Sequence, residues 1–190
     1  MLLINGSPKL KKSNSNYFLN LISKKEPIIY LYKDNFSKID LKHHDTIVFS
    51  FPLYVDSIPS KVTEFIEYLD NSNIDISNKK IYAICNCGFL EPIHNEIALK
   101  IIENFTFKRQ ALYKGHISVG AGEIIGKRKD NCIYKIMSIS FTFKFLWFKH
   151  CIKKGKEINL STTIHPMTKK VYIKLANKSW KKKMKLNKIS

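Results

Sequence analysis

The chain has 190 residues, of which 44% are hydrophobic and 25% are charged. This length and apolar share predict a single domain, residues 1–190, with room for a sizeable core. Its four cysteines, Cys85, Cys87, Cys132 and Cys151, show neither paired metal-ligand spacing nor the framework of a small secreted protein. No secretory signal precedes the first apolar run, so we expect a cytoplasmic protein.

The formal net charge of +18 is concentrated in one part of the chain. Residues 1–123 hold 15 Lys and Arg against 13 Asp and Glu, whereas residues 124–190 hold 18 against 2, a net charge of +16. We interpret 124–190 as a basic, helical C-terminal third of the same domain. Such a run can bind polyanions, but a solvated helix face is the default. Nucleic acid is therefore not an expected partner, while peripheral contact with an anionic membrane stays open.

The first apolar run, Met1–Asn5, predicts a buried strand, and a polar loop then leads to apolar residues at helical spacing from Tyr17 onwards. This loop reads Gly6-Ser-Pro-Lys-Leu-Lys-Lys-Ser-Asn-Ser15. It lacks the second glycine of a nucleotide P-loop and the Gly-x-Gly-x-x-Gly of a dinucleotide site. Its hydroxyl groups, together with Lys9, Lys11 or Lys12, suit a single terminal phosphate at a helix start, as in flavin mononucleotide (FMN). The competing interpretation is a plain helix N-cap at Ser13 or Ser15.

Further along the chain, apolar runs predict four more strands, at Pro27–Tyr32, Thr46–Phe51, Lys80–Asn86 and Leu112–Val119. Helical spacing predicts helices from Pro59 or Ser60 to Leu69 and from Pro92 to Phe105, and only a short helix or none within Lys33–Asp45. Strands that alternate with helices predict an α/β fold, a five-stranded parallel sheet with helices on both faces and extra C-terminal helices.

Ligands of such sheets bind beyond the carboxyl ends of the strands, where the chain order reverses. The third strand ends in Pro52-Leu53-Tyr54-Val55, and the fourth ends in Asn86-Cys87-Gly88-Phe89. The first of these loops offers an apolar wall, and Gly88 permits close approach of a ligand to the backbone. These parts favour a flat, mostly apolar ring with polar edges. We interpret Cys85 and Cys87 as small buried residues of the strand end, not as a redox or metal pair.

Residues Tyr134–Cys151 are rich in aromatic side chains and raise the question of a membrane segment. The longest stretch without a charge, Ile136–Phe143, is far shorter than the roughly 20 residues that cross a bilayer. Two alternatives remain. Either this helix lies on an anionic membrane with Phe141, Phe145, Trp147 and Phe148 inserted, or it packs on the sheet and a partner subunit. We favour packing, since Met137, Phe141, Phe145 and Phe148 form one face and the sheet needs cover.

These loops resemble those of the flavodoxin-like NAD(P)H-dependent FMN oxidoreductases. Gly6-Ser7-Pro8-Lys9 with Ser13-Asn14-Ser15 resembles the phosphate loop of that family, usually Gly-Ser-Pro-Arg followed by Asn-Thr. Pro52 to Pro59 is similar to its flavin-edge loop, and Asn86 to Leu99 is similar to its third loop and the following helix. Weaker similarity continues over Gly115–Gly122 and Tyr172–Trp180. Lys9 replaces the usual arginine and gives up a bidentate grip on phosphate.

The resemblance implies noncovalent FMN, NAD(P)H as electron donor, a small-molecule or protein electron acceptor, and a homodimer. It places Ser7, Lys9, Ser13, Asn14 and Ser15 at the phosphate, and Pro52, Leu53, Tyr54, Val55, Asn86, Gly88 and Phe89 at the ring and its edge. No catalytic acid or base is expected, because the flavin carries the hydride chemistry. His94 and Glu96 are expected on a helix surface. Two alternatives stay open: a flavodoxin-like electron carrier or sensor without reductase activity, and an FMN-free module that acts through its basic third.

Overall fold

A six-stranded parallel sheet forms the centre of the computed structural model, which describes residues 1–72, 74–127, 132–165 and 168–186. The strand order is β2-β1-β3-β4-β5-β6, and every neighbouring pair is parallel. The strands are β1 (Leu2–Asn5), β2 (Ile28–Tyr30), β3 (Thr46–Pro52), β4 (Lys80–Asn86), β5 (Leu112–Val119) and β6 (Ile158–Thr162). The order of the first five is that of a flavodoxin-like sheet, with its switch point between β1 and β3.

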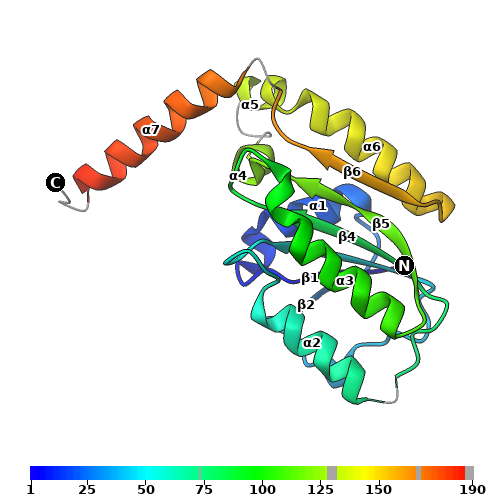
Figure 1. The fold of residues 1–190 in the computed structure, drawn as a ribbon. Helices are drawn as coiled ribbons and strands as arrows, with labels where there is room; N and C mark the ends of the chain where they lie inside the picture. The colour runs from blue at the N-terminus through cyan, green and yellow to red at the C-terminus, as the bar shows by residue number, and fades with distance from the viewer. Residues whose placement is uncertain (73, 128–131, 166–167, 187–190) are drawn as a thin grey trace.

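Helices cover both faces of this sheet (Figure 1). They are α1 (Asn14–Ile22), α2 (Ser60–Asn71), α3 (Glu96–Lys108), α4 (Gly122–Gly126), α5 (Cys132–Met137), α6 (Ile139–Lys154) and α7 (Lys169–Leu186). Short 3-10 turns occur at η1 (Leu10–Lys12), η2 (Phe36–Lys38) and η3 (Pro92–Asn95). One buried cluster lies beneath α2 and α3 and includes Phe65 and Ile102, and the other lies beneath α1 and α6 and includes Phe18 and Phe148.

The predicted parallel sheet with helices on both faces is confirmed, but the predicted number of five strands is wrong. The sixth strand, β6, adds to the edge of the sheet beside β5. It follows α6, so part of 124–190, which the sequence predicts to be a basic, helical third, instead forms a strand. Only Ile158 and Leu160 alternate with polar residues in β6, and such a short alternation does not stand out in a lysine-rich sequence. Between β2 and β3 the structure has only η2, as predicted.

Helix α6 packs on the sheet through the face that the sequence predicts. Met137, at the end of α5, and Phe141, Phe145 and Phe148 of α6 are all buried, and they contact the cluster that contains Phe18. These three phenylalanines are therefore not available to a membrane, and the alternative of inserting them is wrong. Among the described residues, no helix combines the length and the apolar character that a bilayer crossing needs.

The buried face of α6 leads to a stability prediction with a matched control. Phe145 is 3% exposed, whereas Phe143, one half-turn away on the same helix, is 69% exposed. Phe145→Ala should lower the free energy of unfolding by about 3 to 5 kcal/mol, because it leaves a cavity between α6 and the sheet. Phe143→Ala should change it by less than about 0.5 kcal/mol. Denaturant unfolding followed by circular dichroism measures both, and equal losses would contradict the packing described here.

Candidate functional site

A cleft of about 440 Å³ lies at the carboxyl ends of β1, β3 and β4, on either side of the switch point. Three loops and the short helix α4 form its wall. The lining residues are Ser7, Lys9, Lys12, Ser13, Asn14, Ser15, Pro52, Leu53, Tyr54, Asn86, Cys87, Gly88, Glu123 and Lys127. The structure thus brings together ten of the twelve residues that the sequence suggests for a cofactor.

A second hollow of similar size, about 450 Å³, lies at the end of β2 and is lined by the segment from Leu31 to Ser37 and by α2. Its wall carries Asp34 and Glu64 beside Lys33 and Lys61, so its charges offset one another. The cleft at the switch point instead gathers hydroxyl groups, a helix N-terminus and three lysines. We therefore take the switch-point cleft as the candidate site.

The side chain of Asn5, the last residue of β1, fixes the first loop through hydrogen bonds. Asn5 is fully buried, and its Oδ1 accepts a hydrogen bond from the Ser7 amide at 2.8 Å. Its Nδ2 donates to the Leu10 carbonyl and to Ser13 Oγ, both at 3.3 Å. Gly6 is required for packing, since a Cβ there would overlap Val62. The sequence alone does not mark Asn5 as a residue of the site, because Asn5 looks there like the polar end of a strand.

Most backbone amides of this loop are already used inside it. The amides of Ser7 and Lys9 donate to side chains of the loop region, and those of Leu10, Lys12 and Ser13 donate to loop carbonyls. Pro8 has no amide hydrogen. A nucleotide P-loop, by contrast, points a series of free amides at the phosphates. The structure therefore agrees with the sequence in excluding that type of cradle.

Ser13 is the N-cap of α1, so the capping interpretation is confirmed for this residue. Its Oγ accepts from the Asn16 amide at 3.0 Å and donates to the Leu10 carbonyl at 2.6 Å. A hydroxyl group has a single hydrogen, and that of Ser13 is committed to the loop. Ser13 lines the cleft, but it serves there as a structural residue. Ser15 lies inside α1 and does not cap it.

The donors that remain for an anion come from four sources. Ser7 Oγ accepts from the Lys9 amide at 3.4 Å, and Ser15 Oγ accepts from Asn86 Nδ2 at 3.3 Å. Each hydroxyl therefore keeps its own hydrogen to donate. The amides of Asn14 and Ser15 lie in the first turn of α1, where an α-helix offers no acceptor within itself. The exposed amines of Lys9 and Lys12 add positive charge, which fits one terminal phosphate.

The loop after β3 forms one wall and a strained tip. Leu53 donates its amide to the Asn86 carbonyl at 2.8 Å, which fixes this loop to the end of β4. Tyr54 and Ser57 exchange two backbone hydrogen bonds around a tight turn, in which Val55 and Asp56 have φ of 47° and 55°. A β-branched residue is strained in this left-handed region. Val55 is 99% exposed and lies outside the cleft lining, in contrast to its predicted place at the ring edge.

The loop after β4 provides the opposite wall. Asn86 is buried and donates to the Phe51 carbonyl at 3.0 Å as well as to Ser15, so it joins the ends of β3 and β4 to α1. Apart from Gly88 and its two chain neighbours, no residue has an atom within 4 Å of the place where Gly88 would carry a Cβ, so the wall is open there. The Phe89 ring contacts the His94 ring in a tilted arrangement, with ring centroids 4.5 Å apart, and does not line the cleft. Its predicted place at the ring is therefore not where this structure puts it.

Four lining residues are absent from the predicted set: Lys12, Cys87, Glu123 and Lys127. Lys12 is one of the three loop lysines that the sequence offers as partners of a phosphate. Glu123 and Lys127 form an exposed ion pair at 2.8 Å along α4, and a five-residue helix has too little periodicity to be found in a sequence. Burial is the main cause that raises the pKa of the Cys87 thiol, which keeps it protonated at neutral pH.

Cys85 and Cys87 are both buried, as the sequence predicts, and burial also raises the pKa of Cys85. His94, in η3, and Glu96, at the start of α3, are both exposed, again as predicted. Within the part of the chain that the structure describes, no group of three or more His, Cys, Asp or Glu side chains is arranged to hold a metal ion.

Comparison with known proteins identifies relatives by structure and not by sequence. No protein-family model matches the chain, and no curated protein matches it either. Among solved structures, the general stress protein 14 of Treponema denticola in complex with FMN superposes with a TM-score of 0.55 at 15% identity, over 80% of this chain and 98% of that chain. The Trp repressor binding protein of Bacillus subtilis gives 0.55 at 15% identity, over 67% and 95%.

A third solved structure, an NADPH-quinone reductase from P.pentosaceus, gives a TM-score of 0.50 at 17% identity, over 63% of this chain and 84% of that chain. At such identities the likeness shows the fold. The chain therefore has the flavodoxin-like fold of these proteins, which agrees with the resemblance found in its loops.

Proposed function

We propose that this chain binds FMN noncovalently in the switch-point cleft and passes electrons from NAD(P)H through it to an acceptor. The observation that carries the proposal is the mixed chemistry of the cleft lining. Ser7, Ser15, Lys9 and Lys12 supply donors and positive charge, while Pro52, Leu53 and Tyr54 supply an apolar wall and Gly88 leaves an opening. The volume lies within the range of small-molecule sites.

The chain's own residues would bind and orient the cofactor, and bound FMN would supply the hydride chemistry. The two serine hydroxyls and the first-turn amides of α1 would hold the terminal phosphate, and Tyr54 and Leu53 would exclude water from one face of the ring. The structural neighbours support this assignment, since one is described as an FMN complex and another as an NADPH-quinone reductase.

The proposal is tested on the purified full chain. After reconstitution with FMN and removal of free flavin, we expect flavin absorbance to remain with the protein, and anaerobic NADPH or NADH should bleach it. Retained flavin that neither nucleotide bleaches would reject the reductase and favour an electron carrier or sensor. A chain that retains no flavin would reject the whole proposal and favour an interaction module.

The phosphate end of the cleft is tested with two neighbouring lysines. Lys12 lines the cleft, whereas Lys11 belongs to the same turn and does not. Lys12→Gln should weaken FMN binding by about tenfold, because it removes a charged hydrogen-bond donor, and should leave riboflavin binding unchanged. Lys11→Gln is the matched control and should affect neither ligand. Equal losses of FMN and riboflavin in Lys12→Gln would contradict a phosphate at this end.

We also propose that the chain forms a homodimer with the cleft near the subunit boundary. The resemblance implies this assembly, and exposed apolar side chains near the cleft support it: Val55, Phe89, Ile93 and Ile97. Sedimentation velocity at micromolar concentration should give a dimer, and Ile97→Asp should shift it toward the monomer because a charge would be buried at the boundary. A monomer in the unchanged protein would overturn the proposal.

A further inference from the structure

Helix α7 extends away from the rest of the molecule. Figure 1 shows it leaving the sheet and its covering helices beside α5 and running outward along its length. It is attached near its start, where Tyr172 packs against the core cluster under α6 and donates its hydroxyl hydrogen to the Gly88 carbonyl at 3.2 Å. An 18-residue helix is about 27 Å long, so most of α7 lies beyond this attachment.

One stripe along α7 is basic. Lys170, Lys174, Lys178 and Lys181 are all exposed and follow one another at i, i+4, i+8 and i+11, a spacing that places them on one face. The sequence has no Asp or Glu after Glu157, so α7 contains no carboxylate to neutralise these amines. Like charges at such spacing oppose helix formation, and an anionic partner would relieve this repulsion.

A second stripe along α7 is apolar and also exposed. Ile173, Trp180 and Met184 lie at i, i+7 and i+11 and are 44%, 64% and 41% exposed. At about 100° per residue, this stripe lies roughly a quarter of a turn around the helix from the lysines. An exposed tryptophan beside two other exposed apolar side chains marks a surface that contacts a partner.

The two stripes together select the partner. A second copy of this helix would place its lysines near those of the first copy, and the repulsion between them disfavours pairing of two α7 helices. A nucleic acid would neutralise the lysines but leave the apolar stripe in water. An anionic bilayer satisfies both stripes, because the apolar side chains enter the acyl boundary while the amines stay among the headgroups. Tryptophan is moreover favoured at that boundary.

We propose that α7 is a peripheral membrane-binding helix that lies in the surface of an anionic phospholipid bilayer, with Ile173, Trp180 and Met184 inserted and the lysine stripe at the headgroups. The proposal is independent of the function assigned to the cleft. Because Tyr172 fixes the start of α7 to the loop after β4, binding in this way places the cleft beside the membrane surface.

Co-sedimentation of the full chain with vesicles tests this proposal. The protein should sediment with vesicles of phosphatidylserine and phosphatidylcholine, should not sediment with phosphatidylcholine alone, and should be released by high salt. In a Trp147→Phe background the remaining tryptophan is Trp180, whose fluorescence should shift to shorter wavelength on the anionic vesicles. Unshifted emission during sedimentation would overturn insertion of this stripe.

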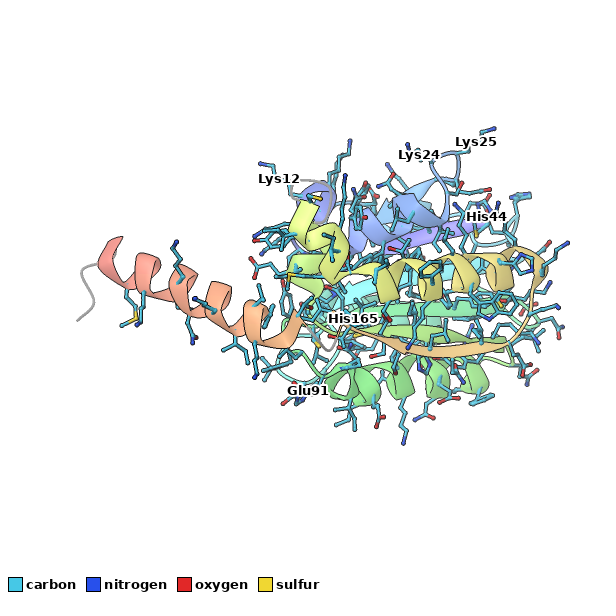
Figure 2. All side chains as sticks on the ribbon, turned by 90° about the horizontal axis from the view of Figure 1, so that it is seen from above. Lys12, Lys24, Lys25, His44, Glu91 and His165 are labelled. Atoms are coloured by element: carbon cyan, nitrogen blue, oxygen red, sulfur yellow. The ribbon has the colours of Figure 1, made fainter. Side chains whose placement is uncertain are left out.

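Matched variants separate the two stripes from the charge of the whole chain. Ile173→Ser with Trp180→Ser, and separately Lys174→Gln with Lys178→Gln, should each lower the partition coefficient by at least about tenfold. The control for the lysines is Lys24→Gln with Lys25→Gln, two exposed lysines that Figure 2 shows far from α7. The control for the apolar stripe is Phe107→Ser, which removes a side chain that is 62% exposed near the end of α3.

Both controls should sediment like the unchanged protein. Circular dichroism of each variant checks that it remains folded, so that a loss of binding is not mistaken for unfolding. Equal losses in the α7 variants and in their controls would overturn the proposal. So would tight binding of a single-stranded oligonucleotide that Trp180→Ser leaves unaffected, combined with no binding to vesicles, because α7 would then be a nucleic-acid surface.

Discussion

Two buried asparagine amides, Asn5 and Asn86, hold the three loops of the cleft together, and the geometry of the site depends on them. Asn5 fixes the first loop through its amide and carbonyl groups, and Asn86 joins β3, β4 and α1. A carboxamide both donates and accepts within one planar group, whereas an aspartate could not donate. Loss of either amide would leave buried loop groups without partners, at about 1 to 3 kcal/mol for each group.

The hydrogen bonds inside the loop after β1 explain why this loop resembles a phosphate loop and yet differs from a nucleotide P-loop. Its amides close a compact 3-10 turn, and Ser13 uses its hydroxyl to cap α1. The loop is therefore held in place before any ligand binds. A P-loop offers its own loop amides to a phosphate, whereas this loop offers side chains, and the free amides come from the first turn of α1. A small, terminal anion suits such a surface better than the extended phosphates of a nucleotide.

Strand runs and helix faces could be predicted from the sequence because they depend on burial. The runs at Thr46–Phe51 and Lys80–Asn86 form strands within a residue of their predicted bounds, since a parallel strand covered on both faces must be apolar nearly throughout. The edge strand β6 was missed because half of it faces solvent. The sequence predicts Val55 and Phe89 at the ring and its edge, whereas a tight turn and a tilted contact with the His94 ring place them outside the cleft lining.

A hydrogen bond from Tyr172 to the Gly88 carbonyl joins α7 to a wall of the cleft. An exposed bond of this kind contributes only about 0.5 to 1.5 kcal/mol, and together with the packing of Tyr172 against the core cluster it orients the first turn of α7. Gly88 also forms the open part of that wall. A movement of α7 would therefore act first on the Gly88 peptide, which borders the cleft. The cleft and the basic helix are thus coupled through this contact, although separate parts of the sequence form them.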